Sequence, residues 1–362
     1  MSILIFILVL IVLIVVHEFG HFVAAKLSGM RVDEFGLGYP PRAVTVATVG
    51  ETRYTLNWLP FGGFVKIFGE DGAEKGSRAF GSRPRILQAI VLIAGVTMNL
   101  LFAYVLITGA LIAGTPRALS QDELASAHDM ELAVANVLPD SPAAVAGLLP
   151  GDSIISATDS TGQWRDVDPE SFSRFVAASK GSEITLDIKR NGEAQTLAAT
   201  PETGVAKSDP SRYALGVEVA TIGIVPLPFG KAIKEGGVLT WEIIKLTATG
   251  LWHFFYSALT LTADLSQVAG PVGIAGVVGA ASLSGLGGLF SIVAIISINL
   301  ALINLIPVPA LDGGRLLFVI IESVIRRPIA PRISYAVNAV GFALLLLLMV
   351  VVTTHDIFKI VG

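Results

Sequence analysis

The chain has 362 residues, of which 53% are hydrophobic and only 15% are charged, and its net charge is −4. Soluble domains carry about 25% charged residues, so this composition indicates an integral membrane protein, and the acidic balance argues against a nucleic-acid partner. The sequence contains no cysteine, which excludes disulfide bonds, cysteine ligands to a metal and thiol catalysis.

Four segments are long and apolar enough to cross a bilayer, which takes about 20 residues in a helix. They cover approximately residues 3–25, 86–113, 289–308 and 336–352. The first has no basic residue before its apolar core, so we interpret it as a retained span rather than as a signal peptide.

The first span contains the sequence HEFGH, which places His17, Glu18 and His21 where lipid-facing residues would be expected. Residues i and i+4 share a helix face, so the two imidazoles can bind one metal ion while Glu18 stands beside its water. An ionisable group costs about 2.5 to 3.5 kcal/mol at the centre of a membrane helix. Three ionisable residues within five positions therefore indicate one shared function, namely zinc-dependent hydrolysis within a membrane. The alternative is a hydrated polar cluster without metal.

Basic residues predict the orientation of the spans. Residues 26–85 hold nine Lys or Arg, and residues 309–331 add three more. Loops rich in these residues stay in the cytoplasm. Both termini should then lie outside, with His17 and His21 towards the cytoplasmic face.

Residues 114–225 have the composition of a soluble insert. Residues 131–137 and 184–190 alternate as strands do, Asn191-Gly192 is a hairpin turn signal, and residues 169–179 resemble a short helix. The run DSPAAVAGLLPGDSII at residues 140–155 resembles the PDZ domains of bacterial membrane and periplasmic proteases, over about residues 131–202. Such domains bind an extended peptide or a C-terminus. The alternative is a structural domain without a ligand.

After the insert, residues 226–288 form a region of interfacial helices and loop, with one or two amphipathic helices over 230–261. His253 lies there among aromatic residues and is not expected to bind metal. A catalytic zinc usually has three protein ligands. The candidates for the third are Asp312, Glu322, His355 and Asp356. Membrane depth favours Asp312, with Glu322 as the alternative, and Gly313-Gly314 would allow a sharp turn beside it.

Several motifs occur together in one order. They are HEFGH, FGGFVKIFGE at residues 61–70, the PDZ-like insert, GPVG at residues 270–273 and SINLALINLIPVPALDGG at residues 297–314. Together they resemble the site-2 protease family, in particular its bacterial regulator of sigma-E protease branch. The resemblance implies His17, His21 and Asp312 as zinc ligands and Glu18 as the catalytic base. It also implies a re-entrant β loop.

Two features depart from that family. The insert has room for one clear PDZ copy, whereas some relatives carry two. Val96 stands where the family commonly has Pro, although Asn99 still matches.

Substrate contacts are predicted at two places. Residues 53–59 and 64–68 look like strands around a turn at 60–63, so Gly62, Gly63 and Phe64 would belong to a hairpin that dips into the membrane and pairs with an unwound substrate. The alternative is an ordinary surface hairpin. In the third span, Pro307 and Pro309 would free backbone carbonyls near Asn299 and Asn304, which together could hold an extended substrate. Asn299 could equally serve helix packing.

The sequence thus predicts a polytopic α-helical membrane protein with four spans, a re-entrant β hairpin and one α+β PDZ-like extracytoplasmic domain. Its divisions are residues 1–113, 114–225, 226–288 and 289–362. The predicted function is a multi-pass zinc endopeptidase of the bacterial inner membrane that cleaves single-span proteins, such as anti-sigma factors or remnant signal peptides. The alternatives are a metal or proton transporter using the same His, Glu and Asp, and an inactive PDZ scaffold.

Overall fold

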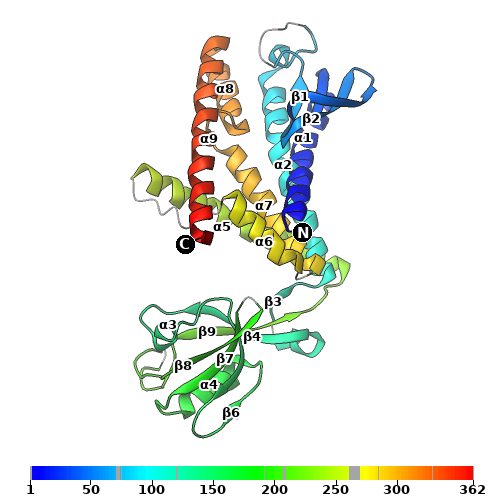
Figure 1. The fold of residues 1–362 in the computed structure, drawn as a ribbon. Helices are drawn as coiled ribbons and strands as arrows, with labels where there is room; N and C mark the ends of the chain where they lie inside the picture. Colours follow the sequence, from blue (N-terminus) through cyan, green and yellow to red (C-terminus); the bar gives the residue numbers. More distant parts are fainter. Residues whose placement is uncertain are drawn as a thin grey trace. The chain divides into compact units, whose positions relative to one another are not determined.

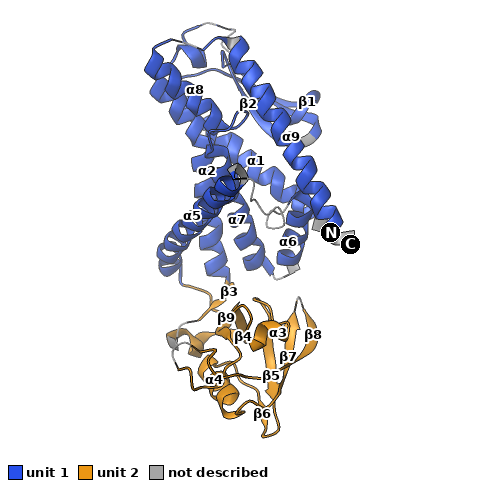
Figure 2. Cartoon of the chain, turned by 90° about the vertical axis from the view of Figure 1, so that its left-hand side faces the viewer, with its two compact units in different colours: residues 1–113, 228–362 blue, residues 114–227 orange. Residues whose placement is uncertain are grey.

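The structure is a computed structural model that describes residues 2–70, 74, 76–119, 121–190, 192–206, 209–260, 270–283, 285–327 and 329–361. The chain divides into two compact units (Figure 2). Unit 1 comprises residues 1–113 and 228–362, and unit 2 comprises residues 114–227.

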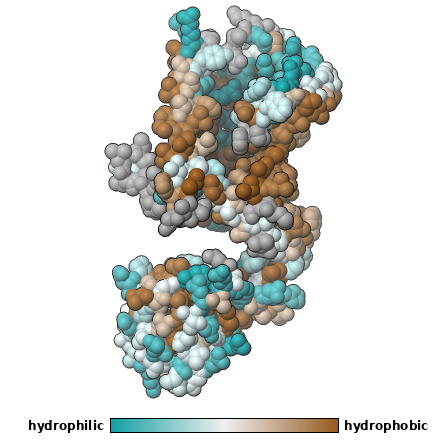
Figure 3. Space-filling model, viewed as in Figure 1, coloured by the Kyte–Doolittle hydropathy of each residue, from teal (hydrophilic) through white to brown (hydrophobic). Residues whose placement is uncertain are grey.

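Unit 1 contains the four predicted spans. These are α1 (Ser2–Leu27), α2 (Arg85–Ala113), α7 (Gly285–Leu305) and α9 (Pro331–Val361), each with a stretch long and apolar enough to cross a membrane (Figure 1). Hydrophobic residues gather over these helices in Figure 3. The third helix ends at Leu305 rather than at the predicted residue 308, because a residue that precedes proline, such as Ile306, is disfavoured in the helical conformation.

Helix α2 packs between α1 and α7, and small residues let the helices approach closely. A Cβ on Gly20 of α1 would lie 2.4 Å from the carbonyl oxygen of Ala94 in α2. Farther along, Val9 and Leu13 of α1 pack with Val293 of α7. Close backbone contact through glycine is typical of membrane helices, and here it brings α2 against the turn of α1 that carries the HEFGH residues.

The described residues of unit 1 form three more α-helices. They are α5 (Phe229–Leu259), α6 (Pro271–Leu283) and α8 (Asp312–Ile325). Helix α5 is one continuous element over most of the region 230–261, where one or two helices were expected, and Trp241, Trp252 and His253 are exposed. Helix α6 was not predicted. Its N-terminus is capped across the fold by Asp356 of α9, which accepts hydrogen bonds from Gly270 N at 3.1 Å and Gly273 N at 2.8 Å.

The predicted local hairpin around residues 60–63 is wrong. The chain instead forms two long strands, β1 (Val32–Val49) and β2 (Thr52–Ile67), which turn at residues 50–51. Residues 34–37 of β1 have partners in both ends of β2, so that Phe35 is paired with Val65 and with Tyr54. The segments 53–59 and 64–68 therefore do not pair with each other, because β1 lies between them.

The glycines that suggested a turn have another use. A Cβ on Gly62 would lie 2.4 Å from the ring of Tyr39, and a Cβ on Gly63 would lie 2.8 Å from Ile14 and 3.3 Å from Glu18 Cγ of α1. Gly62 also has φ of 106°, which favours glycine. These two residues let β2 pass directly against Tyr39 and helix α1.

Unit 2 is built on one sheet with strand order β3-β9-β4-β5-β7-β8, and β6 pairs with β5. The strands are β3 (Pro116–Ala118), β4 (His128–Val137), β5 (Ser153–Thr158), β6 (Gln163–Trp164), β7 (Ile184–Arg190), β8 (Glu193–Ala199) and β9 (Val217–Ile224). Two short helices, α3 (Pro142–Val145) and α4 (Pro169–Ala178), accompany the sheet, with 3-10 turns at Phe80–Ser82 in unit 1 and Gln121–Ser126 in unit 2.

The elements predicted within the insert are confirmed. Strand β7 has the predicted bounds, β4 contains residues 131–137, and α4 begins at Pro169 behind an N-cap in which Asp168 accepts from two backbone N–H groups. Arg190 pairs with Glu193 across the predicted turn, where Gly192 has φ of 90° and residue 191 lies outside the described residues. The sheet extends beyond residues 131–202, because β9 pairs with both β4 and β3.

The core of unit 2 includes Leu132, Phe172 and Leu186, all at most 2% exposed. Asp152 is also buried, and Arg190 donates to both of its carboxylate oxygens at 2.7 and 2.6 Å. These bonds from Arg190 hold the pKa of the Asp152 carboxyl below its usual value.

Candidate metal centre

Helix α1 presents His17, Glu18 and His21 in one turn and a half. His17 and His21 are buried at 7% and 8% exposure, and their Nε2 atoms lie 3.2 Å apart. The i, i+4 spacing on a regular helix produces this convergence. The two imidazoles therefore point into the same space, as the sequence predicted.

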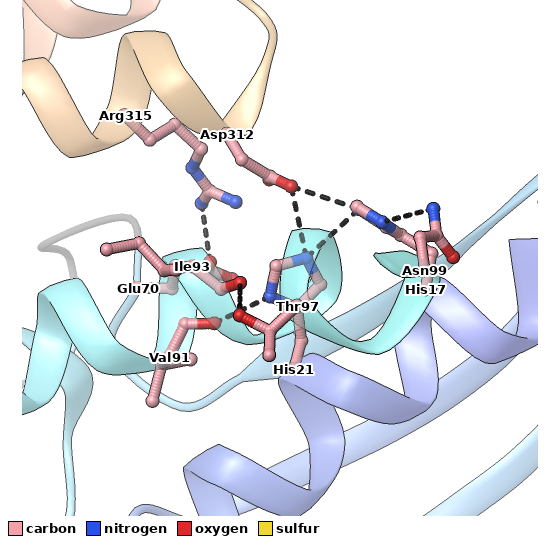
Figure 4. Close-up of polar contacts among 9 residues, drawn as sticks. All are labelled: His17, His21, Glu70, Val91, Ile93, Thr97, Asn99, Asp312 and Arg315. Carbon is pink, nitrogen blue, oxygen red and sulfur yellow. Dashed lines mark hydrogen bonds and ion pairs between the residues drawn. The ribbon is translucent and has the colours of Figure 1, made fainter. Parts of the chain in front are cut away.

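Asp312 meets both histidines from the first turn of α8. Its Oδ2 lies 3.0 Å from His17 Nε2 and 3.2 Å from His21 Nε2 (Figure 4). The two glycines that follow let α8 start against the preceding loop, because a Cβ on Gly313 or Gly314 would lie 2.3 Å from the carbonyl oxygens of Ile306 and Val308 respectively. The predicted glycine requirement beside Asp312 thus has a steric cause.

This donor set suits zinc. Among the residues that the structure describes, His17, His21 and Asp312 form a group in which one ligand atom of each lies within 4.8 Å of the others. Two imidazole nitrogens and a carboxylate oxygen are a usual catalytic zinc set, which leaves the fourth position for a reactant.

The other candidate ligands have different roles. Glu322 forms an ion pair with Arg85 at 2.7 Å and accepts a hydrogen bond from Ile329 N at 2.8 Å. Asp356 caps α6, and the neighbouring His355 belongs to the same part of α9. Asp312 is therefore the candidate that the fold brings to His17 and His21.

Helix α2 supplies a second layer behind the imidazoles. His21 Nδ1 lies 2.8 Å from the carbonyl oxygen of Val91, and Asn99 Nδ2 lies 3.2 Å from His17 Nδ1. Between them, a Cβ on Gly95 would lie 2.4 Å from His21 Nε2 and 2.8 Å from His17 Cε1. Residues 91, 95 and 99 follow one another at helical spacing, so one stripe of α2 backs both rings.

A cavity of about 340 Å³ opens on the three candidate ligands. It is lined by Glu18, Tyr39 and Asn304, and by the β2 residues Gly62, Gly63 and Phe64. Arg315 and Glu70 also line it and form an ion pair at 2.6 Å that joins α8 to the turn after β2. The Tyr39 phenol is a hydrogen-bond donor at neutral pH, because the ordinary pKa of tyrosine is about 10.

The predicted substrate residues separate into two groups. Asn304, Gly62, Gly63 and Phe64 line the cavity, whereas Asn299, Pro307 and Pro309 do not belong to its lining. The two prolines follow the end of α7 instead of interrupting it. Pro309 packs against α9, where a Cβ on Gly341 would lie 2.5 Å from the Cβ of Pro309.

Sequence reasoning missed five contributors to the site: Tyr39, Glu70, Val91, Gly95 and Arg315. Gly95 and Asn99 offered a signal, because a glycine followed four residues later by a polar amide inside an apolar span marks a helix face in close polar contact. The carbonyl of Val91 and the pairing of Glu70 with Arg315 carry no sequence signal, since each depends on contacts between distant segments.

The chain is similar to known peptidases. Peptidase family M50 matches residues 5–348 of the chain. A protein of Clostridium perfringens is 35% identical over 345 residues, with 95% of each chain covered. One from a Nostoc species is 34% identical, with 96% of this chain and 93% of the relative covered, and one from Oceanobacillus iheyensis, RasP, is 29% identical, with 98% of each covered. All three carry the name zinc metalloprotease.

The family match spans the HEFGH helix, the insert and Asp312, and so covers both segments that meet at the candidate metal centre. It also favours a peptidase over a transporter or a scaffold. The chain belongs to peptidase family M50.

Proposed function

We propose that this protein is an intramembrane zinc endopeptidase in which His17, His21 and Asp312 bind the metal and Glu18 is the catalytic base. The observation that carries this assignment is the convergence of three ligand atoms within 4.8 Å, from helices far apart in the sequence, beside a cavity that Glu18 lines. Helix α1, which carries three of these four residues, is apolar enough to span a membrane.

A zinc ion held by His17, His21 and Asp312 would supply Lewis acidity, which would activate water and stabilise negative charge on a carbonyl oxygen. Glu18 takes a proton from the attacking water and delivers it to the leaving amine. His17 and His21 must be neutral to bind metal, and their Nδ1 atoms are held by α2 so that both Nε2 atoms face Asp312. The Tyr39 hydroxyl and the Asn304 amide line the same cavity and can donate hydrogen bonds to the substrate backbone.

The substrate class is a single-span membrane protein, such as an anti-sigma factor or a remnant signal peptide. A substrate helix must unwind before cleavage, and its freed backbone groups need partners in an apolar medium. Residues 63–66 of β2 pair with β1 on one side, and no described strand occupies their other side. Gly63 and Phe64 line the cavity, which supports the addition of the substrate as a strand at this edge.

The orientation in the membrane is also a proposal. The basic residues of segments 26–85 and 309–331 favour a cytoplasmic position for the end of unit 1 that carries β1, β2 and α8. The first turn of α1 and the last turn of α9 lie at the opposite end of unit 1 (Figures 1 and 2). We assign the protein to the bacterial inner membrane, with the termini and unit 2 extracytoplasmic and the active site towards the cytoplasm.

Unit 2 is proposed to be a PDZ-like domain that binds an extended peptide or a C-terminus. A cavity of about 480 Å³ lies between α4 and β9 and is lined by Phe172, Val176 and residues 213–219. β3 pairs with residues 222–224 of β9, and Leu119 N donates to Thr221 O at 2.9 Å, which leaves residues 217–220 with β4 on one side and no described strand on the other. Peptides with a free C-terminal carboxylate and the same peptides with an amide end, compared by fluorescence anisotropy, test this assignment. Binding of neither would reject it.

The catalytic assignment is tested with Glu18→Gln in the purified, detergent-solubilised protein and a model single-span substrate. The variant should retain zinc and lose cleavage, because the amide cannot accept the proton from water. Glu235→Gln, which changes a partly exposed glutamate of α5 that pairs with Lys231, is the matched control and should cleave normally. Equal cleavage by wild type and Glu18→Gln would remove Glu18 from the mechanism.

A further inference from the structure

Asn99 is a fully buried amide in the middle of an apolar helix. Its exposure is 0%, and its backbone carbonyl accepts a hydrogen bond from Ser297 Oγ of α7 at 2.8 Å, which fixes this turn of α2. The side chain contacts the imidazole of His17 (Figure 4). Among the described residues, its Oδ1 atom is buried and has no hydrogen-bond partner. A buried acceptor without a partner is costly in a protein interior, so we expect this atom to accept a hydrogen bond in the working protein.

Metal binding by His17 requires one particular tautomer of its imidazole. His17 Nε2 faces His21 and Asp312, so Nε2 is the atom available to a metal. A neutral imidazole that binds metal through Nε2 carries its proton on Nδ1 and donates it to an acceptor. The carboxamide of Asn99, 3.2 Å from Nδ1, contains such an acceptor in Oδ1. Rotation of the carboxamide by 180° exchanges its nitrogen and oxygen within the same space.

His21 already has the corresponding arrangement. Its Nδ1 lies 2.8 Å from the carbonyl oxygen of Val91, an acceptor that cannot donate. Val91 and Asn99 are two helical turns apart on α2, with Gly95 between them under both rings. One helix thus offers an oxygen acceptor to each imidazole.

We propose that Asn99 is a positioning residue whose Oδ1 accepts the Nδ1 proton of His17 and thereby selects the tautomer that binds metal through Nε2. The proposal rests on the assignment of His17 as a zinc ligand. It gives the polar amide inside α2 a specific purpose beyond helix packing, and it makes α2 part of the metal centre although α2 carries no ligand.

The test measures zinc affinity by competition with a chromophoric chelator in the purified full-length protein. Asn99→Leu removes the acceptor at similar size and should weaken zinc binding by about 10- to 100-fold. Asn99→Asp keeps an oxygen acceptor and should rescue affinity to within a few-fold of wild type. Thr108→Val is the matched control, because Thr108 is also buried in α2 and its hydroxyl has no described partner. It should bind zinc as wild type does.

A spectroscopic readout separates positioning from packing. Labelling with ¹⁵N-histidine yields few signals, because the chain has five histidines, and the His17 signals are identified by their loss in His17→Ala. In the zinc-loaded wild type and in Asn99→Asp, the proton of His17 should reside on Nδ1. A proton on Nε2, or wild-type zinc affinity in Asn99→Leu, would overturn the proposal. If Asn99→Leu does not fold, the Asn99→Asp variant keeps the test decisive, because loss of zinc affinity despite its retained oxygen acceptor would overturn the proposal.

The same series distinguishes this inference from the proposed function. If His17→Ala retains full zinc affinity, the assignment of His17 as a ligand is wrong, and the role of Asn99 fails with it. If His17→Ala loses zinc while Asn99→Leu keeps it, only the role of Asn99 fails.

Discussion

Gly95 is the position where a single methyl group should do most damage to the metal centre. A Cβ on Gly95 would lie 2.4 Å from His21 Nε2 and 2.8 Å from His17 Cε1, whereas ordinary contacts begin at 3.4 Å. The rings would therefore have to move by about 1 Å, and misplacement of catalytic groups on that scale costs about 100-fold in rate. Overpacking of this kind also costs about 1–3 kcal/mol of stability.

The assay compares Gly95→Ala with Gly109→Ala on the same helix. A Cβ on Gly109 would meet Phe290 at 3.4 Å, an ordinary van der Waals contact. We expect Gly95→Ala to bind zinc about 10- to 100-fold more weakly, measured by chelator competition, and to lose cleavage. Gly109→Ala should match wild type in both. Wild-type zinc affinity in Gly95→Ala would refute the close packing of α2 on the two imidazoles.

Three further predictions concern other parts of the fold. Gly63→Ala should lose cleavage but retain zinc, because the new methyl group would press on Ile14 at 2.8 Å and on Glu18 at 3.3 Å rather than on the ligands; loss of zinc would contradict this. Unit 2 should lose stability in acid, because the pKa of Asp152 is lowered in the folded protein by its pair with Arg190. The stabilisation from this pair is complete above the ordinary carboxyl pKa of about 4, and it is lost as the pH falls towards the lowered pKa. Hydrogen exchange of the β5 and β7 amides in the full chain, corrected for intrinsic rates, should show this loss of stability in acid. Asp152→Asn should destabilise unit 2 by about 3 kcal/mol at pH 7, and unchanged protection of these amides in the variant would refute the role of the pair. Asp356→Ala should speed hydrogen exchange in α6, because it leaves the N–H groups of Gly270 and Gly273 without their acceptor at a cost of about 1–3 kcal/mol each. The control Ile357→Ala, at an exposed position, should not change this exchange. Equal exchange in the two variants would show that Asp356 is not the cap of α6.

Hydropathy and helical periodicity predicted those elements of the structure that depend on local sequence. The four spans follow from segment length and composition, and the meeting of His17 with His21 follows from i, i+4 spacing. The predicted bounds of β7 and the predicted start of α4 at Pro169 also held, because strand alternation and a proline in the first turn of a helix are local signals.

The β segment shows where local signals mislead. A glycine pair was interpreted as a turn, but Gly62 and Gly63 serve close approach to Tyr39 and α1. The actual turn at residues 50–51 could not be chosen from the sequence, because β1 pairs with both ends of β2 over long distances in the chain. The same limit applies to α2, whose backing of the imidazoles arises only from helix packing.

The central claim is that one zinc ion is held jointly by α1 and α8. Zinc K-edge X-ray absorption on the purified full-length protein tests it directly. The spectrum should show two imidazole nitrogens at about 2.0–2.1 Å and oxygen ligands at about 2.0–2.2 Å, and zinc content should fall sharply in a His17→Ala, Asp312→Ala double variant. An unchanged spectrum at full zinc occupancy in that double variant would contradict the claim.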